Sequence, residues 1–155
     1  MHRRPDAAGG FSAIALIFLV GLIGGIVLNF ALPLPIWPSL WIRPIGLAPL
    51  IAAIWLFTSA RRAFRRHLTA LMPWTPSTSL VEEGPYSFSR NPIYLAFIMF
   101  YLGLAFLFDS LYVLGMMVVI LVLFDRFQIP REERYLQQKF GAEYGNHMSR
   151  VRRWV

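Results

Sequence analysis

The sequence predicts an all-α integral membrane protein with four transmembrane helices and a C-terminal amphipathic cytoplasmic helix. The 155 residues are 57% hydrophobic, and their mean hydropathy of +0.54 is well above that of soluble domains. Four apolar segments are long enough, or nearly so, to cross a bilayer. Clusters of arginine flank these segments, as is typical of membrane surfaces. A chain of this length is expected to form a single membrane domain over residues 1–155.

The first apolar segment covers residues 11–32 and follows Arg3 and Arg4. A signal peptide has a similar arrangement of charge, but this segment is too long for its apolar core and no small-residue cleavage motif follows. We therefore expect a retained transmembrane helix. Gly21 and Gly25 form a G-x-x-x-G pair, which indicates close packing against another helix.

The second apolar segment covers residues 44–60, and Pro49 can kink it. A stiff connector separates it from the first helix and contains Pro33, Pro35 and Pro38. Trp37 and Trp41 in this connector fit an aromatic belt at the membrane interface. The segment stops at a basic cluster formed by Arg61, Arg62, Arg65 and Arg66. Residues 11–60 are thus expected to supply two scaffold helices.

The third and fourth apolar segments cover residues 93–108 and 111–127. Asp109 and Ser110 between them leave room only for a tight turn, so an antiparallel helical hairpin is expected. The polar stretch before the hairpin, residues 67–90, is rich in Pro, Ser and Thr, and we expect a loop with a short interfacial helix there.

After the hairpin the chain becomes charged while keeping a helical pattern. Pro130 suits the first turn of a helix. Leu136, Phe140 and Tyr144 recur at intervals of four residues, which predicts one amphipathic helix with a single apolar stripe.

The arginines also orient the helices. The loop between the second and third segments carries five arginines if Arg90 is included, and the opposite side carries only Arg43. Four crossings place both termini on the arginine-rich side, and the positive-inside rule makes that side cytoplasmic. The expected location is the plasma or inner membrane of a prokaryote, with both termini in the cytoplasm.

Composition excludes several classes of site. The chain has no cysteine, which excludes disulfides, thiolate nucleophiles and cysteine-ligated metals. Its three histidines are scattered, so no metal site is expected. The net charge of +7 follows the membrane boundaries and shows no basic and aromatic alternation, so nucleic acid is not an expected partner. Membrane lipids are expected to contact the arginine clusters.

Polar and aromatic groups are predicted to meet at the two cytoplasmic ends of the hairpin. Asn91 and Pro92 have the features of an N-cap and first helical position, and the same helix start beside Arg90 can bind a carboxylate or phosphate. Glu132 and Glu133 can equally be first-turn acids that favour the helix dipole. The tyrosines of this region can be interfacial aromatics, and Gly84-Pro85 can be only a turn. Each feature has such a structural interpretation, but their combination around one hairpin favours a ligand site.

Residues 81–154 resemble the isoprenylcysteine carboxyl methyltransferase and phospholipid methyltransferase superfamily of integral membrane enzymes. The matching motifs are G-P-Y at 84–86, R-N-P-I-Y at 90–94, R-E-E-R-Y-L at 131–136, F-G-A-E-Y at 140–144 and V-R-R-W at 151–154. The resemblance implies that the hairpin and C-terminal helix, residues 81–154, form an S-adenosylmethionine pocket. Asn91 stands where many members have His, and His147 stands where a second Tyr is common.

The resemblance assigns roles to individual side chains. Arg90 and Glu133 are the expected catalytic residues. Arg90 and the helix start can hold the cofactor carboxylate, Glu132 or Glu133 the ammonium or the ribose hydroxyls, and the tyrosines the adenine or the sulfonium. The expected cofactor-binding residues are Gly84, Pro85, Tyr86, Arg90, Asn91, Pro92, Tyr94, Glu132, Glu133, Tyr135, Tyr144 and His147.

The expected activity is methyl transfer from S-adenosylmethionine to a lipophilic or lipid substrate. An isoprenylcysteine carboxyl methyltransferase-like reaction needs no general base, whereas a phospholipid N-methyltransferase does, and His147 keeps this second reaction open. Two alternatives of other classes are a non-enzymatic small membrane protein and a nicotinamide-dependent membrane reductase.

Overall fold

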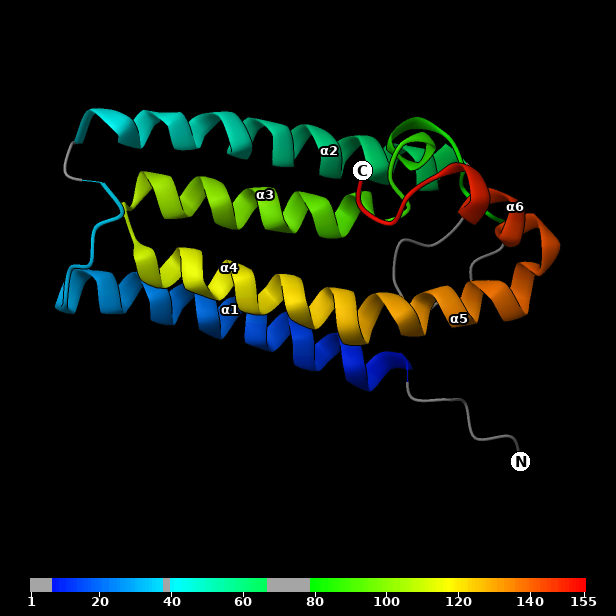
Figure 1. The fold of residues 1–155 in the computed structure, drawn as a ribbon, viewed down its shortest axis with the longest axis horizontal. Coiled ribbons are helices and arrows are strands. Elements are labelled where there is room, and N and C mark those ends of the chain that lie inside the picture. The colour runs from blue at the N-terminus through cyan, green and yellow to red at the C-terminus, as the bar shows by residue number, and fades with distance from the viewer. Residues whose placement is uncertain (1–6, 38–39, 67–78) are drawn as a thin grey trace.

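The computed structural model describes residues 7–37, 40–66 and 79–155, and all regular structure in these ranges is helical. Four helices run along the long axis of the molecule, each antiparallel to the one before it in sequence (Figure 1). They are α1 (Ala7–Ala31), α2 (Leu47–Arg66), α3 (Pro92–Leu107) and α4 (Leu111–Leu123). The prediction of an all-helical chain is confirmed for these residues.

The helices pack as two pairs, α2 on α3 and α1 on α4, which are joined through the α3–α4 hairpin (Figure 1). Small residues allow the close approaches. A Cβ atom on Gly103 would lie 2.8 Å from the Gly46 carbonyl oxygen, and one on Gly25 would lie 3.2 Å from a Val113 methyl group. A Cβ atom on Gly21 would meet the end of the Met116 side chain. The predicted packing role of Gly21 and Gly25 is therefore confirmed.

One end of the bundle, here called the turn end, contains the connector between α1 and α2 and the α3–α4 turn. The connector includes a 3₁₀ helix, η1 (Leu40–Gly46). Asp109 is buried with a φ of +51°. Its Oδ1 atom accepts hydrogen bonds from the backbone N–H groups of Ile36 (2.9 Å) and Trp37 (3.1 Å). The predicted tight turn at Asp109 and Ser110 is confirmed, and the Ser110 hydroxyl caps α4.

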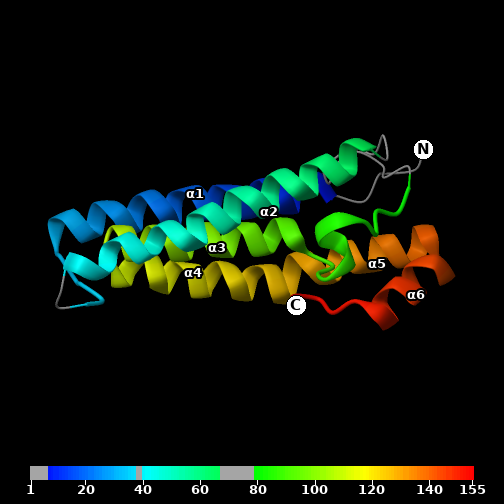
Figure 2. The same cartoon turned by 90° about the horizontal axis from the view of Figure 1, so that it is seen from above.

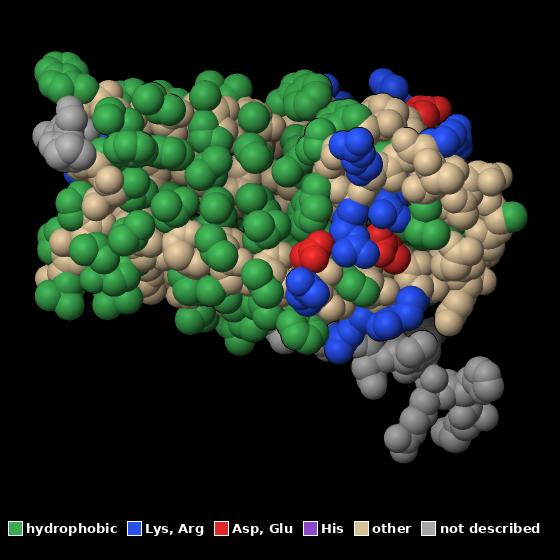
Figure 3. Space-filling model, viewed as in Figure 1, with side chains coloured by type: hydrophobic (Ala, Val, Ile, Leu, Met, Phe, Trp, Pro, Cys, Tyr) green, Lys and Arg blue, Asp and Glu red, His purple; other side chains and the backbone are tan. Residues whose placement is uncertain are grey.

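The face of the bundle that Figure 3 shows is largely apolar. Two continuous helical stretches, Trp41–Arg66 and Leu111–Phe140, are long and apolar enough to cross a membrane. Only 17% of the most apolar part of the first stretch and 28% of that of the second is buried inside the protein. Leu16–Ala31 and Pro92–Leu107 are shorter apolar helices. Exposed apolar side chains such as Phe30 and Trp55 are costly in water, so this surface suits a bilayer.

One predicted helix boundary is wrong. The second helix does not stop at Ala60 but continues through the basic cluster to Arg66, because arginine is a good helix former and its long side chain reaches outward. Pro49 lies in the first turn of α2, where its missing N–H leaves no helical hydrogen bond unmade.

The single amphipathic helix expected from Pro130 onward is also wrong. No break separates α4 from α5 (Ile129–Phe140), because a turn of π-helix, η3 (Phe124–Gln128), joins them. A π turn just before Pro130 relieves the clash of the proline ring with the preceding helical turn. Gly141, with a φ of +51°, then separates α5 from α6 (Ala142–Arg150). Leu136 and Phe140 therefore lie on a different helix from Tyr144.

Candidate functional site

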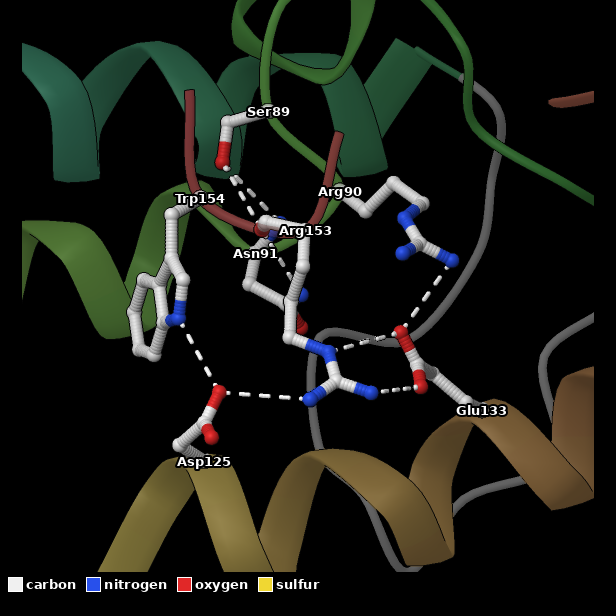
Figure 4. A network of polar contacts seen from close by, with 7 residues as sticks. All are labelled: Ser89, Arg90, Asn91, Asp125, Glu133, Arg153 and Trp154. Carbon is white, nitrogen blue, oxygen red and sulfur yellow. Dashed lines mark hydrogen bonds and ion pairs between the residues drawn. The ribbon is translucent and has the colours of Figure 1, made fainter. Parts of the chain in front are cut away.

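Most charged side chains gather at the end of the bundle opposite the turn end, here called the polar end (Figure 3). It combines the C-terminal part of α2, a 3₁₀ turn η2 (Gly84–Ser87), the start of α3, and α5 and α6 (Figure 2). The last residues of the chain turn back across the start of α3 (Figure 4). Residues 67–78, the first half of the polar stretch discussed above, lie outside the described residues.

Arg90 and Glu133 form an ion pair at the centre of the polar end. Arg90 Nη1 lies 3.1 Å from Glu133 Oε1, and the two side chains are only 14% and 16% exposed. Arg90 precedes α3 and Glu133 lies on α5, so the pair joins the two sides of the hairpin (Figure 4). The Arg90 Nε atom is buried and has no hydrogen-bond partner in the described part of the chain. It therefore remains free to donate to a bound group.

Asn91 lies at the N-cap position of α3 and Pro92 at its first position, as predicted, but the Asn91 side chain makes no capping hydrogen bond. Its Nδ2 atom instead donates to the Arg153 carbonyl oxygen at 3.0 Å. The Ser89 hydroxyl accepts a hydrogen bond from the Asn91 backbone N–H at 3.2 Å. The helix start is thus tied to the C-terminal segment.

Glu132, beside Glu133 on α5, has a different environment. Its Oε2 atom accepts a hydrogen bond from the Tyr94 hydroxyl at 2.8 Å. It forms no ion pair with any residue that the structure describes. The predicted residues Tyr86 and Tyr144 are close enough for the two glutamates to perturb their hydroxyl groups. Among the described residues, Glu132 therefore has three tyrosines around it and no cation, and its burial and the neighbouring Glu133 raise its pKa.

These tyrosines stay protonated at neutral pH. Burial, and then the nearby Glu132 carboxylate, raises the pKa of Tyr86 well above its usual value. Burial and the Glu133 carboxylate raise the pKa of Tyr144 to about 12. Tyr86 also packs edge-on against Phe64 of α2, with ring centroids 5.4 Å apart. The aromatic groups can therefore donate hydrogen bonds or face a cation, but they cannot supply negative charge.

The other predicted residues lie around this cluster. Gly84 (φ +61°) and the buried Pro85 form the turn that positions Tyr86. His147 is buried on α6, with Nδ1 3.5 Å from Glu82 Oε1, and burial lowers its pKa. Tyr135 is 42% exposed, and its hydroxyl accepts a hydrogen bond from Lys139. The structure does not bring Tyr135 to the cluster.

Three residues complete the network in Figure 4, of which sequence reasoning included Arg153 and Trp154 only as part of the 151–154 motif and did not consider Asp125. Arg153 binds both oxygens of Glu133, at 3.3 and 2.7 Å, and also Asp125 at 3.2 Å. Trp154 Nε1 donates to Asp125 Oδ1 at 3.1 Å. Hydrogen bonding to Glu133 raises the pKa of Arg153, so its charge is permanent. Asp125 could have been identified from the sequence, because it is the first acidic residue after an apolar helix, and an acidic residue near a membrane is costly unless it has a partner.

In the described part of the chain, no group of three or more His, Cys, Asp or Glu side chains is arranged to hold a metal ion. The groups available for binding are therefore the arginines, carboxylates and tyrosines described above.

Residues 41–143 match the family model for phospholipid methyltransferases. The chain is 30% identical over 132 residues to protein-S-isoprenylcysteine O-methyltransferase B of Arabidopsis thaliana, covering 81% of this chain and 66% of that protein. It is 28% identical over 110 residues to the cobalt-zinc-cadmium resistance protein CzcN of Cupriavidus metallidurans, covering 70% of this chain and 49% of that protein.

A third similarity, to an uncharacterized protein of Haemophilus influenzae, is 51% identity over 47 residues, or 30% of this chain and 73% of that protein. No solved structure matches the chain significantly. The family match covers the second to fourth bundle helices and most of the polar end, and on this basis the chain belongs to the phospholipid methyltransferase family of membrane proteins.

Proposed function

We propose that this protein is an integral membrane methyltransferase that uses S-adenosylmethionine and acts on a lipophilic substrate. The observation that carries the proposal is Glu132, a carboxylate that meets no cation among the described residues and is surrounded by Tyr86, Tyr94 and Tyr144. A carboxylate among aromatic rings is a favourable site for a sulfonium or ammonium group. Family membership supports the same chemistry.

The charged and hydrogen-bonding side chains of the polar end fit the charges of S-adenosylmethionine. When bound, S-adenosylmethionine supplies the methyl group that is transferred in a single displacement. Glu132 and the tyrosines would hold its positive charge, and the unpaired Nε atom of Arg90 would donate to its carboxylate. Arg90 and Glu133 would act in catalysis by fixing the position of the reactants, which can supply a large part of the rate.

The fold supports a proposed four-span topology. The bundle places the arginines of α2 and the C-terminus at the polar end and Arg43 at the turn end (Figure 1). The positive-inside rule then makes the polar end cytoplasmic, with both termini on that side and α5–α6 at the membrane surface. Because the chain has no native cysteine, single cysteines replacing Ser39 and Ser149 can test this. They should label from opposite sides of the membrane, and labelling from one side would contradict the topology.

A lipophilic acceptor would reach the polar end sideways from the bilayer. The similarity to an isoprenylcysteine O-methyltransferase favours a carboxylate acceptor, and the phospholipid methyltransferase family match keeps an amine headgroup as the second candidate. Shortening the apolar tail should lower kcat/KM, because each CH₂ withdrawn from an apolar site costs about 0.8 kcal/mol of binding free energy. Equal kcat/KM for a soluble analogue without a tail would contradict lateral entry.

The cofactor proposal has a direct test. S-adenosylmethionine and its demethylated product should raise the melting temperature of the detergent-purified protein, whereas a nicotinamide dinucleotide should not. Arg90→Ala should remove most of this effect, because losing one partner of a shielded charge pair costs about 2–5 kcal/mol. Stabilisation by the nicotinamide nucleotide alone would instead indicate a reductase. A methyl-labelled cofactor incubated with membrane extract would then identify the acceptor.

A further inference from the structure

Residues 151–154, next to the C-terminal Val155, cross the polar end and are here called the C-terminal strap. We infer that Arg153 in this strap is a positioning residue, which holds Glu133 in the orientation that Glu133 needs to fix Arg90 for the cofactor. This inference rests on the proposed function, because it concerns the same site.

The strap is attached to the start of α3 through its backbone. The Arg90 backbone N–H donates to the Arg152 carbonyl oxygen at 3.0 Å. The Asn91 side chain donates to the next carbonyl, that of Arg153, also at 3.0 Å, and the Ser89 hydroxyl approaches that oxygen at 3.5 Å. Two consecutive carbonyl groups of the strap therefore bind the segment that carries Arg90.

The side chain of Arg153 points the other way, towards α5 and the π turn (Figure 4). It binds Glu133 with two nitrogens and Asp125 with the third. A guanidinium group has the planar fork that such double pairing requires, and a lysine side chain does not. Asp125 in turn accepts a hydrogen bond from Trp154. The Arg153 side chain is therefore held between Glu133 and Asp125.

The consequence is a difference between the two adjacent glutamates. Glu133 is bound by two arginines, Arg90 and Arg153, so its charge is compensated and its orientation is fixed. Glu132 meets no cation in the part of the chain that the structure describes, and it remains available to a ligand. Without Arg153, Glu133 would be free to rotate, and Arg90 would lose its fixed partner. Asp125 lies in the π-helical turn, a feature that often occurs at functional sites.

The neighbouring arginine offers a matched control. Arg152 is exposed, and its side chain forms no hydrogen bond or ion pair with any residue that the structure describes. Its carbonyl contact with the Arg90 N–H does not depend on its side chain. Arg152→Gln therefore removes the same charge from the same strap and leaves the network intact.

The test is the affinity of the full-length protein in detergent for S-adenosylhomocysteine, measured by calorimetry. Arg153→Gln should weaken binding by at least tenfold, Arg153→Lys by less, and Arg152→Gln by less than twofold. In a Glu133→Gln background, Arg153→Gln should cost less than twofold further, because Arg153 acts through Glu133. Thermal unfolding without ligand shows whether each variant is folded.

Wild-type affinity that persists in a folded Arg153→Gln protein would overturn the inference and leave the proposed function standing. A full tenfold loss in the Glu133→Gln background would also overturn it, because Arg153 would then act independently of Glu133. Absence of binding by the wild-type protein would instead contradict the proposed function itself.

Discussion

The two ends of the bundle each carry an acidic side chain near the expected membrane surface, but the two carboxylates are satisfied in different ways. At the turn end, Asp109 is buried and receives two backbone N–H groups, with Arg43 at 3.5 Å. At the polar end, Glu132 accepts a hydrogen bond from one tyrosine hydroxyl and meets no cation among the described residues. A carboxylate that accepts hydrogen bonds from backbone N–H groups elsewhere in the chain stabilises the fold, whereas one left among aromatic rings remains available for a ligand. The comparison predicts separable effects on stability and on binding.

The largest expected effect is on folding, at the turn end. Asp109→Ala removes the acceptor of the Ile36 and Trp37 N–H groups, and it also places alanine at a positive φ. We expect a loss of about 2–4 kcal/mol in the free energy of unfolding, because each unsatisfied buried group costs about 1–3 kcal/mol. Unfolding in mixed detergent micelles measures this loss. The folded fraction should bind the cofactor normally. A loss of cofactor affinity without a loss of stability would contradict the purely structural role of Asp109.

The next effect is on binding, at the polar end. Glu132→Gln keeps the side-chain volume and an acceptor for the Tyr94 hydroxyl, but it removes the charge. Cofactor affinity should fall about 10–100-fold, since a hydrogen bond to a charged group contributes about 1.5–3 kcal/mol. Stability should be unchanged. Glu143→Gln, on the exposed surface of α6, is the control for charge alone. Equal affinity losses in the two variants would show that only net charge matters.

Packing near the turn end gives a third effect, again on stability alone. A Cβ atom on Gly103 would lie 2.5 Å from Leu50 Cγ and 2.8 Å from the Gly46 carbonyl oxygen. Gly103→Ala should therefore lower the free energy of unfolding by about 1–3 kcal/mol. A Cβ atom on Gly115 in α4 meets no atom within 4 Å, so Gly115→Ala should stabilise by about 0.5–1 kcal/mol. The same sign for both variants would contradict the close approach of α3 to η1.

The smallest effect is the pH dependence contributed by His147. Burial lowers its pKa, opposed by Glu82 and reinforced by Arg150 and Arg90. The unfolded state therefore binds a proton more readily, so the stability from neutral His147 is present above its unfolded pKa and is lost as the pH falls through its folded pKa. Between about pH 7.5 and 5.5 the melting temperature of His147→Gln should therefore fall less than that of the wild type. Parallel pH profiles would show that His147 is not buried as a neutral group.

Much of the fold was predictable, because helices in a bilayer are encoded locally. The apolar segments, the tight turn at Asp109 and the first position of α3 at Pro92 all follow from short stretches of sequence. The errors arose where tertiary context changed a local rule. Pro130 lies in the first turn of α5, as predicted, but the π turn joins α5 to α4 without a break. The predicted apolar stripe from Leu136 to Tyr144 did not take account of the helix break at Gly141.

The sequence by itself determined that this is an all-helical membrane protein and which region carries the polar residues, because hydrophobicity and arginine placement act over neighbouring residues. It identified Arg90, Glu132 and Glu133 as candidates but could not distinguish the two adjacent glutamates. Only the tertiary structure did so, since the difference depends on Arg153, twenty residues from Glu133 in the chain and 2.7 Å from it in space. Ion pairing depends on distance in space, and the folding back of the strap decides which carboxylate is neutralised and which remains without a cation.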